Sequence, residues 1–213
     1  MKMNSDSLFA TLKAKRREAA AETVFQAAEQ VIVDKGFEGA TMQDIARRAG
    51  CAAGTLYLYF RNKEDLISLL LGRHMRRMEK LFRDAVGKSE DGLVRLKKGF
   101  QTCLDYCHQH HLVLRVYFST NSSPDMESQL KGEAREAYAN MKALDIESIR
   151  RAQQSGQVRA DIAPEELVEF IYGLFNSALA RWFLRGKGSD AKAQLELIWS
   201  FLVQGLGAEN GTR

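Results

Sequence analysis

The sequence predicts an all-α protein of about nine helices, in which a three-helix head precedes a larger helical domain. The 213 residues include only two prolines, and 45% of them are hydrophobic. These apolar residues recur at spacings of three and four, as on one face of a helix, and valine-rich alternating runs typical of strands are missing. We expect a flexible arm over residues 1–13, a helix-turn-helix domain over 14–66 and a second helical domain over 67–213.

A first helix is expected from about residue 14 to residue 35. Gly36 follows, and glycine readily takes the left-handed backbone that stops a helix. The apolar side of this helix carries Val24, Phe25, Ala28, Val31 and Ile32. Arg16 and Arg17 belong to a basic run at its start, which is either a solvated surface or a contact with nucleic-acid phosphates.

The stretch from Thr41 to Asp65 predicts two short helices joined by a tight turn, with a third helix beginning directly after them. Thr41 with Asp44 three residues later is typical of a capped helix start. Gly50 is placed to end that helix. The layout is a helix-turn-helix, whose second helix is the kind that enters a DNA major groove.

The second helix of the pair has an unusual outer face. With Leu56 as the buried centre and Ala52 and Phe60 beside it, Gly54 and Leu58 point away from the core. Glycine permits close backbone approach, and an apolar side chain can contact a thymine methyl group. We therefore interpret this face as one that contacts DNA.

Three polar residues near this face are further candidates. Gln43 and Arg47 lie four residues apart on the outer side of the preceding helix, which is either an ordinary exposed face or a DNA contact. We favour the contact for Gln43, because a helix start carries positive partial charge. Asn62 with Asp65 three residues later predicts a capped start for the next helix. Lys63 stands at that start, where a phosphate is also favoured.

The charge distribution agrees with a nucleic-acid partner for the N-terminal part. Residues 1–80 carry 14 Lys and Arg against 10 Asp and Glu, which accounts for the whole net charge of +4. A basic excess confined to one domain is expected of a DNA-binding module.

The segments TMQDIARRAG and GTLYLYFRNKEDL, preceded by a helix ending in DKGF, resemble the DNA-binding domain of the tetracycline-repressor (TetR) family of bacterial regulators over residues 17–66. The resemblance implies an all-α homodimer whose variable helical domain binds a small effector and thereby releases DNA. It also implies DNA contacts by Thr41, Thr55, Tyr57, Tyr59 and Lys63. Cys51, Ala52 and Leu58 depart from the family pattern, and the missing serine cap removes about 1 kcal/mol of helix-end stability.

A helix from Lys63 to about Val86 is expected to be shared by both domains, so that a pocket could control the spacing of two DNA-reading heads. Its inward residues are expected to be Leu66, Leu69, Leu70, His74, Met78, Leu81 and Phe82. A linker over 87–92, a helix from Leu93, a short helix over 112–119 and a long helix over 126–154 should follow.

Cys103, Cys107 and His111 recur at steps of four along one predicted helix. They could bind a metal or sense oxidation, but buried core cysteines are the more common case and dedicated zinc sites use closer pairs. We therefore assign no metal and no cofactor, and keep a metal- or thiol-responsive regulator as an alternative.

The last two helices, near 164–185 and 190–206, are the most apolar part of the chain. Their apolar width predicts a four-helix dimer interface across a two-fold axis, with an entirely internal core as the alternative. The expected interface residues are Ile171, Leu174, Ala178, Leu195, Ile198, Trp199 and Leu202.

An effector pocket is expected in the second domain, because aromatic and sulfur-containing side chains are frequent there. The candidates are Phe100, Cys103, Leu104, Cys107, Tyr117, Phe118, Tyr138, Met141, Phe175 and Trp182. Any single one of these is more often plain core than pocket wall, so a pocket is expected more firmly than any particular lining residue.

These features predict a repressor that binds a palindromic double-stranded DNA operator as a homodimer and is released by a small hydrophobic or aromatic effector. The alternative is an architectural protein that binds DNA without sequence preference. An enzyme is disfavoured, because the sequence has no nucleophile elbow or phosphate-binding glycine loop. We expect a cytoplasmic protein with no membrane partner, since the N-terminus lacks the apolar run of a signal peptide.

Overall fold

The computed structural model describes residues 5–87, 89–111, 114, 126–185 and 191–206. Their secondary structure is helical, which confirms the all-α class. The chain divides into two compact units, residues 1–70 and 71–213, which we call the head and the body. Among the described residues, no helix is both long enough and apolar enough to cross a membrane.

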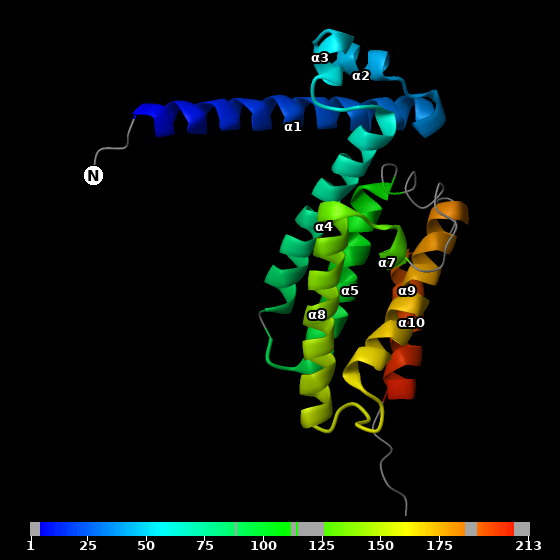
Figure 1. Cartoon of the computed structure of the whole chain (residues 1–213). Helices are drawn as coiled ribbons and strands as arrows, with labels where there is room; N and C mark the ends of the chain where they lie inside the picture. The colour runs from blue at the N-terminus through cyan, green and yellow to red at the C-terminus, as the bar shows by residue number, and fades with distance from the viewer. Residues whose placement is uncertain (1–4, 88, 112–113, 115–125, 186–190, 207–213) are drawn as a thin grey trace, which may run out of the picture. The chain divides into compact units, whose positions relative to one another are not determined.

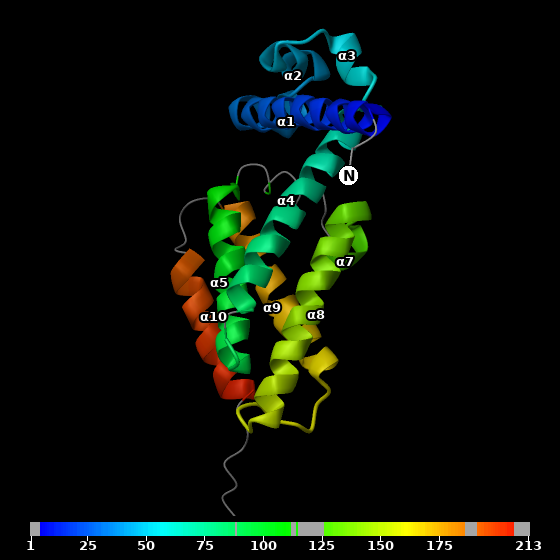
Figure 2. The ribbon, with the colours of Figure 1, turned by 90° about the vertical axis from the view of Figure 1, so that its left-hand side faces the viewer.

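The head contains α1 (Ser5–Gly39), α2 (Met42–Ala49), α3 (Ala53–Tyr57) and the start of α4 (Lys63–Val86). Figures 1 and 2 show α2 and α3 on the same side of α1. The predicted apolar side of α1 is buried there, and Ile45 and Leu56 have 0% and 1% of their surface exposed. Phe25 meets Phe60 edge to face, with ring centroids 5.7 Å apart. These contacts form the small core that holds the helix-turn-helix.

The N-terminal end of α1 differs from the prediction. We expected residues 1–13 to form a flexible arm, but α1 begins at Ser5. This stretch contains no glycine or proline, and Leu8, Ala10, Leu12 and Lys13 are strong helix formers. At the other end, Gly36 has φ 72° and breaks the helical geometry, as predicted.

The body contains the rest of α4 together with α5 (Gly92–Gln109), α7 (Met126–Gln129), α8 (Gly132–Gln154), α9 (Pro164–Arg185) and α10 (Ala191–Leu206). α5 packs on α8, α9 packs on α8, and α10 contacts both α5 and α9. Figures 1 and 2 show these four helices running side by side. Their apolar sides enclose one continuous core, which includes Phe82 and Val86 of α4.

Two glycines allow α5 to approach its neighbours closely. A Cβ atom added to Gly92 would lie 2.2 Å from the carbonyl oxygen of Ser148 in α8. A Cβ atom on Gly99 would lie 2.6 Å from the ring of Phe82 in α4. Gly92 was expected in a linker, but Asp91 caps α5 by accepting a hydrogen bond from the Val94 amide at 2.9 Å. Gly92 therefore begins the helix and is buried.

Two further predictions about the body are corrected. The helix expected over 126–154 is interrupted, because Leu130 turns inward with 2% exposure and Gly132 has φ 51°. Leu69 and Leu81 of α4 were expected inside, yet they are 45% and 49% exposed. The helix predicted over 112–119 lies outside the described residues except for Leu114, which is buried.

Candidate nucleic-acid interface and buried cavity

The first helix of the motif starts with the predicted cap. The Thr41 hydroxyl accepts a hydrogen bond from the Asp44 amide at 3.1 Å and donates one to the Asp44 carboxylate at 2.7 Å. Lys35 of α1 forms an ion pair with the same carboxylate at 2.7 Å. These hydrogen bonds, that from Lys35 first, lower the pKa of Asp44 to about 2. The start of α2 is thus fixed against the end of α1.

The turn between the two motif helices is also as predicted. Gly50 has φ 71°, and the Cys51 amide donates to the Ala46 carbonyl at 3.0 Å. This closes α2 with a left-handed C-terminal residue. Ala52 then precedes α3 without any side-chain cap, as its departure from the family pattern predicted. It is exposed rather than packed beside Leu56, because it lies in extended backbone before the helix begins.

The residues predicted to face DNA at this helix are all exposed: Gly54, Thr55, Tyr57, Leu58 and Tyr59. Leu58 is 81% exposed and is the C-cap residue of α3. Tyr57 and Tyr59 are 55% and 47% exposed. Leu58 and the two tyrosines form an exposed apolar surface, and such surfaces often mark sites that bind a partner. We call these five residues the recognition segment.

The polar candidates around the recognition segment differ in their exposure and in the contacts that their side chains make within the protein. Gln43 is exposed, and Arg47 is exposed with a 3.5 Å contact to Asp44. The Lys63 ammonium, in contrast, donates to the Phe37 carbonyl at 2.9 Å and lies 4.4 Å from the centre of the Phe37 ring. In this conformation it therefore ties α4 to the end of α1 rather than facing a phosphate. The side chains of Arg16 and Arg17 lie outside the described part.

The start of α4 keeps the predicted cap independently of Lys63. The Asn62 side chain accepts a hydrogen bond from the Asp65 amide at 2.7 Å. The Asp65 carboxylate in turn accepts one from the Arg61 amide at 3.0 Å.

Sequence reasoning missed a hollow in the head between α1 and the motif. Its volume is about 220 Å³, and it is lined by Ala20, Ala21, Thr23, Val24, Ala49, Cys51, Thr55, Leu56, Tyr59 and Phe60. Two small α1 residues, Ala20 and Ala21, leave this space beside Tyr59. Only the tertiary contact between α1 and α3 reveals it, since neither helix shows the hollow alone.

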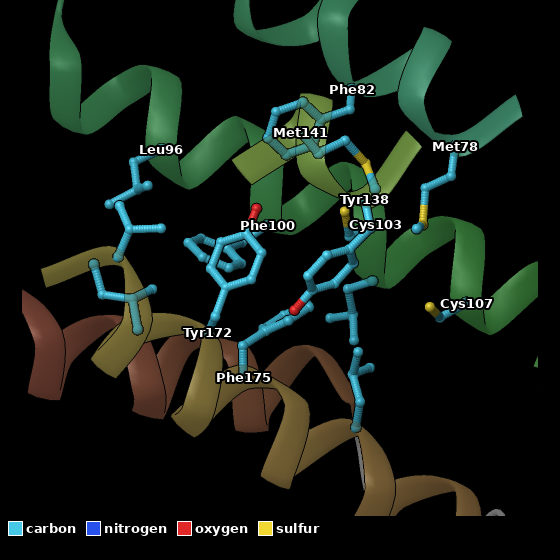
Figure 3. Packing of buried hydrophobic residues seen from close by; sticks show 14 of the residues in the cluster. Met78, Phe82, Leu96, Phe100, Cys103, Cys107, Tyr138, Met141, Tyr172 and Phe175 are labelled. Carbon is cyan, nitrogen blue, oxygen red and sulfur yellow. The ribbon is translucent and has the colours of Figure 1, made fainter. Parts of the chain in front are cut away.

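The body encloses a cavity of about 50 Å³ with an almost entirely apolar wall. Six of the predicted pocket residues line it: Phe100, Cys103, Cys107, Tyr138, Met141 and Phe175. Figure 3 shows the aromatic rings from α5, α8 and α9 gathered together, with the sulfur atoms of Met78 and Cys103 nearby. Leu104 and Trp182 are buried outside this wall. Tyr117 and Phe118 lie outside the described residues.

The prediction missed the contribution of α4 and several polar groups. α4 supplies Leu71, Met75, Met78 and Phe82, of which only Met78 and Phe82 were predicted to face inward, and those as core. The other missed residues are Leu114, Leu130, Asp145, Tyr172, Asn176 and Leu179. Asn176 donates to the Tyr138 hydroxyl at 3.0 Å, and Tyr172 donates to Asp145 at 2.9 Å. Burial raises the pKa of Asp145 to about 8 and that of Tyr138 to about 12.

The cysteines of the cavity behave as core residues. Burial raises the pKa of Cys107 to about 12 and that of Cys103 well above its usual value. Both thiols therefore stay protonated, which disfavours metal binding and oxidation. His111 contacts the His108 carbonyl at 3.2 Å through Nδ1. Across the part of the chain that the structure describes, no group of three or more potential ligands is placed to hold a metal ion.

The predicted interface residues differ in their exposure. Ile171, Ala178 and Leu202 are buried inside the body, with 1%, 7% and 7% exposure. The exposed apolar residues of α9 and α10 include Phe170 (59%), Leu174 (41%), Leu197 (71%), Phe201 (65%) and Val203 (37%). Leu174 is the one predicted residue in this set. Ile198 and Trp199 are half-buried, and the Leu195 side chain lies outside the described part.

A helix-turn-helix head with an exposed recognition segment, continued in one chain by a helical body with an apolar cavity, defines a transcriptional regulator. The family described as "Bacterial regulatory proteins, tetR family" matches residues 24–70, which include the motif, its caps and the recognition segment. Over these residues the chain is similar to this family, and it is also similar to full-length regulators over most of its length.

Two regulators are similar to nearly the whole chain. The fatty acid metabolism regulator protein of Bacillus subtilis (strain 168) is 27% identical over 86% of this chain and 93% of its own length. The transcriptional repressor KstR2 of Mycobacterium tuberculosis is 23% identical over 87% and 92%. The crystal structure of FadR from Bacillus subtilis in complex with stearoyl-CoA has the same fold, with a TM-score of 0.73 and 21% identity over 87% of this chain and 98% of that one.

Proposed function

We propose that the protein is a repressor that binds a palindromic operator as a homodimer and leaves it when a small hydrophobic effector enters the body. The observation that carries this proposal is that α4, which begins at the cap of the head, forms one wall of the apolar cavity. An effector that moves α4 would act on the head through a single helix. The resemblance to repressors and to a regulator solved with an acyl-CoA supports the same reading.

The recognition segment is proposed to read the operator. We propose that Gly54, Thr55 and the two tyrosines contact phosphates and bases, and that Leu58 contacts a thymine methyl group. Selection of bound sequences from random DNA by the purified protein tests this, and a two-fold symmetric consensus is expected. If random DNA and the selected sequence bind equally at each salt concentration, the protein is instead the architectural alternative.

The homodimer is proposed to form through the exposed face of Phe170, Leu174, Leu197 and Phe201. A second copy of the chain fits this face, because two antiparallel pairs of helices related by a two-fold axis bury identical apolar patches. The Phe201→Glu variant should convert a dimeric mass at micromolar concentration into a monomeric one. The matched control is Val94→Glu, which changes another exposed apolar residue, on α5, that is 42% exposed. A monomeric wild type would overturn the interface.

The effector is proposed to be an apolar molecule such as a long acyl chain or a steroid-like ring system. The cavity volume of about 50 Å³ is far smaller than that of typical ligand pockets, which is roughly 300–1,000 Å³. Binding must therefore widen the body, and this widening is the proposed signal. Titration of the protein–operator complex with stearoyl-CoA should release DNA, whereas free coenzyme A should not. Release by neither compound would exclude acyl-CoA esters as effectors.

A further inference from the structure

Asp145 is an ionisable residue in the wall of an otherwise apolar cavity. It lies on α8 with 0% of its surface exposed. Its Oδ2 atom accepts a hydrogen bond from Tyr172 of α9 at 2.9 Å. Its Oδ1 atom has no hydrogen-bond partner among the described residues. Tyr172 thus satisfies one half of the carboxyl group, and the other half has no partner in the part of the chain that the structure describes.

The nearby buried cation does not supply the missing contact. Arg95 of α5 is 7% exposed, and its charge acts on Asp145 from a distance. Its guanidinium donates instead to the Ser148 hydroxyl at 3.2 Å and to the Val86 carbonyl at 3.0 Å. A buried carboxyl oxygen without a partner destabilises the protein, and an apolar residue of similar size would avoid that cost. The position is therefore suited to a partner other than the residues that the structure describes.

The environment of Asp145 restricts what that partner can be. The ionisable groups facing it are Arg95 and Cys103 of α5 and Tyr172 of α9. Burial in this wall favours the neutral acid, and a second anion placed beside it would be repelled. A hydroxyl group can donate to the ionised form or accept from the neutral acid, so it pairs with either state. A carboxylate can accept from the neutral acid but cannot donate to the ionised form, so it pairs with one state only.

We propose that Asp145 is the polar recognition point of the cavity and that the effector carries an uncharged hydroxyl group which hydrogen-bonds Oδ1. The apolar part of the effector then lies among Phe82, Phe100 and Phe175, which line the same cavity. Tyr172 positions the carboxyl group through Oδ2. This inference rests on the proposed effector role of the cavity and specifies the chemistry of the ligand.

Calorimetric titration of the full-length protein with decan-1-ol and 1-fluorodecane tests the proposal. The two probes have the same chain and nearly the same size, but only the alcohol has a hydroxyl group. Wild-type protein should bind the alcohol at least about tenfold more tightly, as expected for one buried hydrogen bond. In Asp145→Leu the ratio of the two affinities should fall to near one. Asp145→Asn, which keeps the size and one acceptor, should retain an intermediate ratio and shows that the site still folds.

Tyr138→Phe is the matched control, because it removes another hydroxyl from the same wall without touching Asp145. The ratio of its affinities for decan-1-ol and 1-fluorodecane should equal the wild-type ratio. Equal binding of both probes to wild-type protein would leave an apolar effector cavity in place but overturn the role of Asp145, whose free oxygen would then be served by water. Loss of the ratio in Tyr138→Phe alone would also overturn it. Binding of neither probe would overturn the effector role of the cavity together with this inference.

Discussion

The candidate contact residues of the head are exposed and lie in one short segment. Those of the body line a buried cavity and come from helices far apart in the chain. Gly54 to Tyr59 are neighbours in sequence, and one helix turn and one cap place them. The cavity wall draws on α4, α5, α8 and α9, so that Leu71 and Leu179 line the same space. A site built from local signals can be located by motif, but a site built from tertiary packing needs the whole fold.

The largest effect should come from breaking the packing on which the body depends. Gly92→Ala places a Cβ atom against the Ser148 carbonyl and the Ala152 amide, which are backbone atoms that cannot move aside. We expect a loss of about 3 kcal/mol in the free energy of unfolding of the body, measured by urea titration. Gly205→Ala, on α10 with open space around it, is the control and should change stability by less than about 1 kcal/mol. Equal effects of the two substitutions would contradict the close approach of α5 and α8.

A second test uses the buried carboxyl group of Asp145 in the body. The pKa of Asp145 is raised from 3.8 to about 8 in the folded protein, so the folded state binds one more proton than the unfolded state between these values. Its contribution to stability is complete below pH 4 and falls by about 1.4 kcal/mol per pH unit as the pH rises toward 8. Asp145→Asn should remove this part of the slope in chemical unfolding measured from pH 5 to pH 8.

Asp44 of the head is the control for the Asp145 test, because its contribution to stability has the opposite pH dependence. Its pKa is lowered to about 2 from 3.8, so its stabilisation is present above pH 4 and is lost as the pH falls toward 2. Asp44→Asn should therefore leave the slope between pH 5 and pH 8 unchanged. A wild-type slope that persists in Asp145→Asn would mean that another group carries the titration.

A third change acts on the recognition segment and should leave the fold intact. Leu58→Ala removes an exposed side chain, so the free energy of unfolding should stay within about 0.5 kcal/mol of the wild type. The preferred base at one position of each half-site should change, with about 1 kcal/mol less discrimination in competition binding. Leu81→Ala, which alters an exposed leucine of the body, should leave the DNA preference as it is. An unchanged preference in Leu58→Ala would contradict the outward face proposed for α3.

The smallest expected effect is a gain. Ala52→Ser restores a side-chain oxygen at the start of α3, where none caps the helix now. The head should become more stable by about 0.5–1 kcal/mol, seen as slower amide hydrogen exchange in α3. Exchange in α8 should not change, since the cap affects only the local helix. Uniformly slower exchange in both units would show that head and body unfold together.

The sequence predicted the caps at Thr41 and Asn62, the turn at Gly50 and the start of α9 at Pro164, because each depends on residues within one helical turn. It did not predict the Asp145–Tyr172 contact, since a carboxylate in a helix is normally expected to face water until its neighbours are known. Ile171 and Ala178, which were predicted at the dimer interface, are buried in the body for a related reason. α9 is apolar on two sides, and periodicity alone cannot decide which side meets the protein's own core.

The contact between Gly99 and Phe82 has a consequence for how α4 can move. The last turn of this helix lies flat on α5 at Gly99, and Arg95 holds its Val86 carbonyl at 3.0 Å. The last turn of α4 is thus anchored on α5 at Phe82. Lys63 lies roughly 28 Å from Phe82 along the helix. Under the proposed mechanism, a ligand that rotated α4 by roughly 5° about Phe82 would shift Lys63 by roughly 2.5 Å.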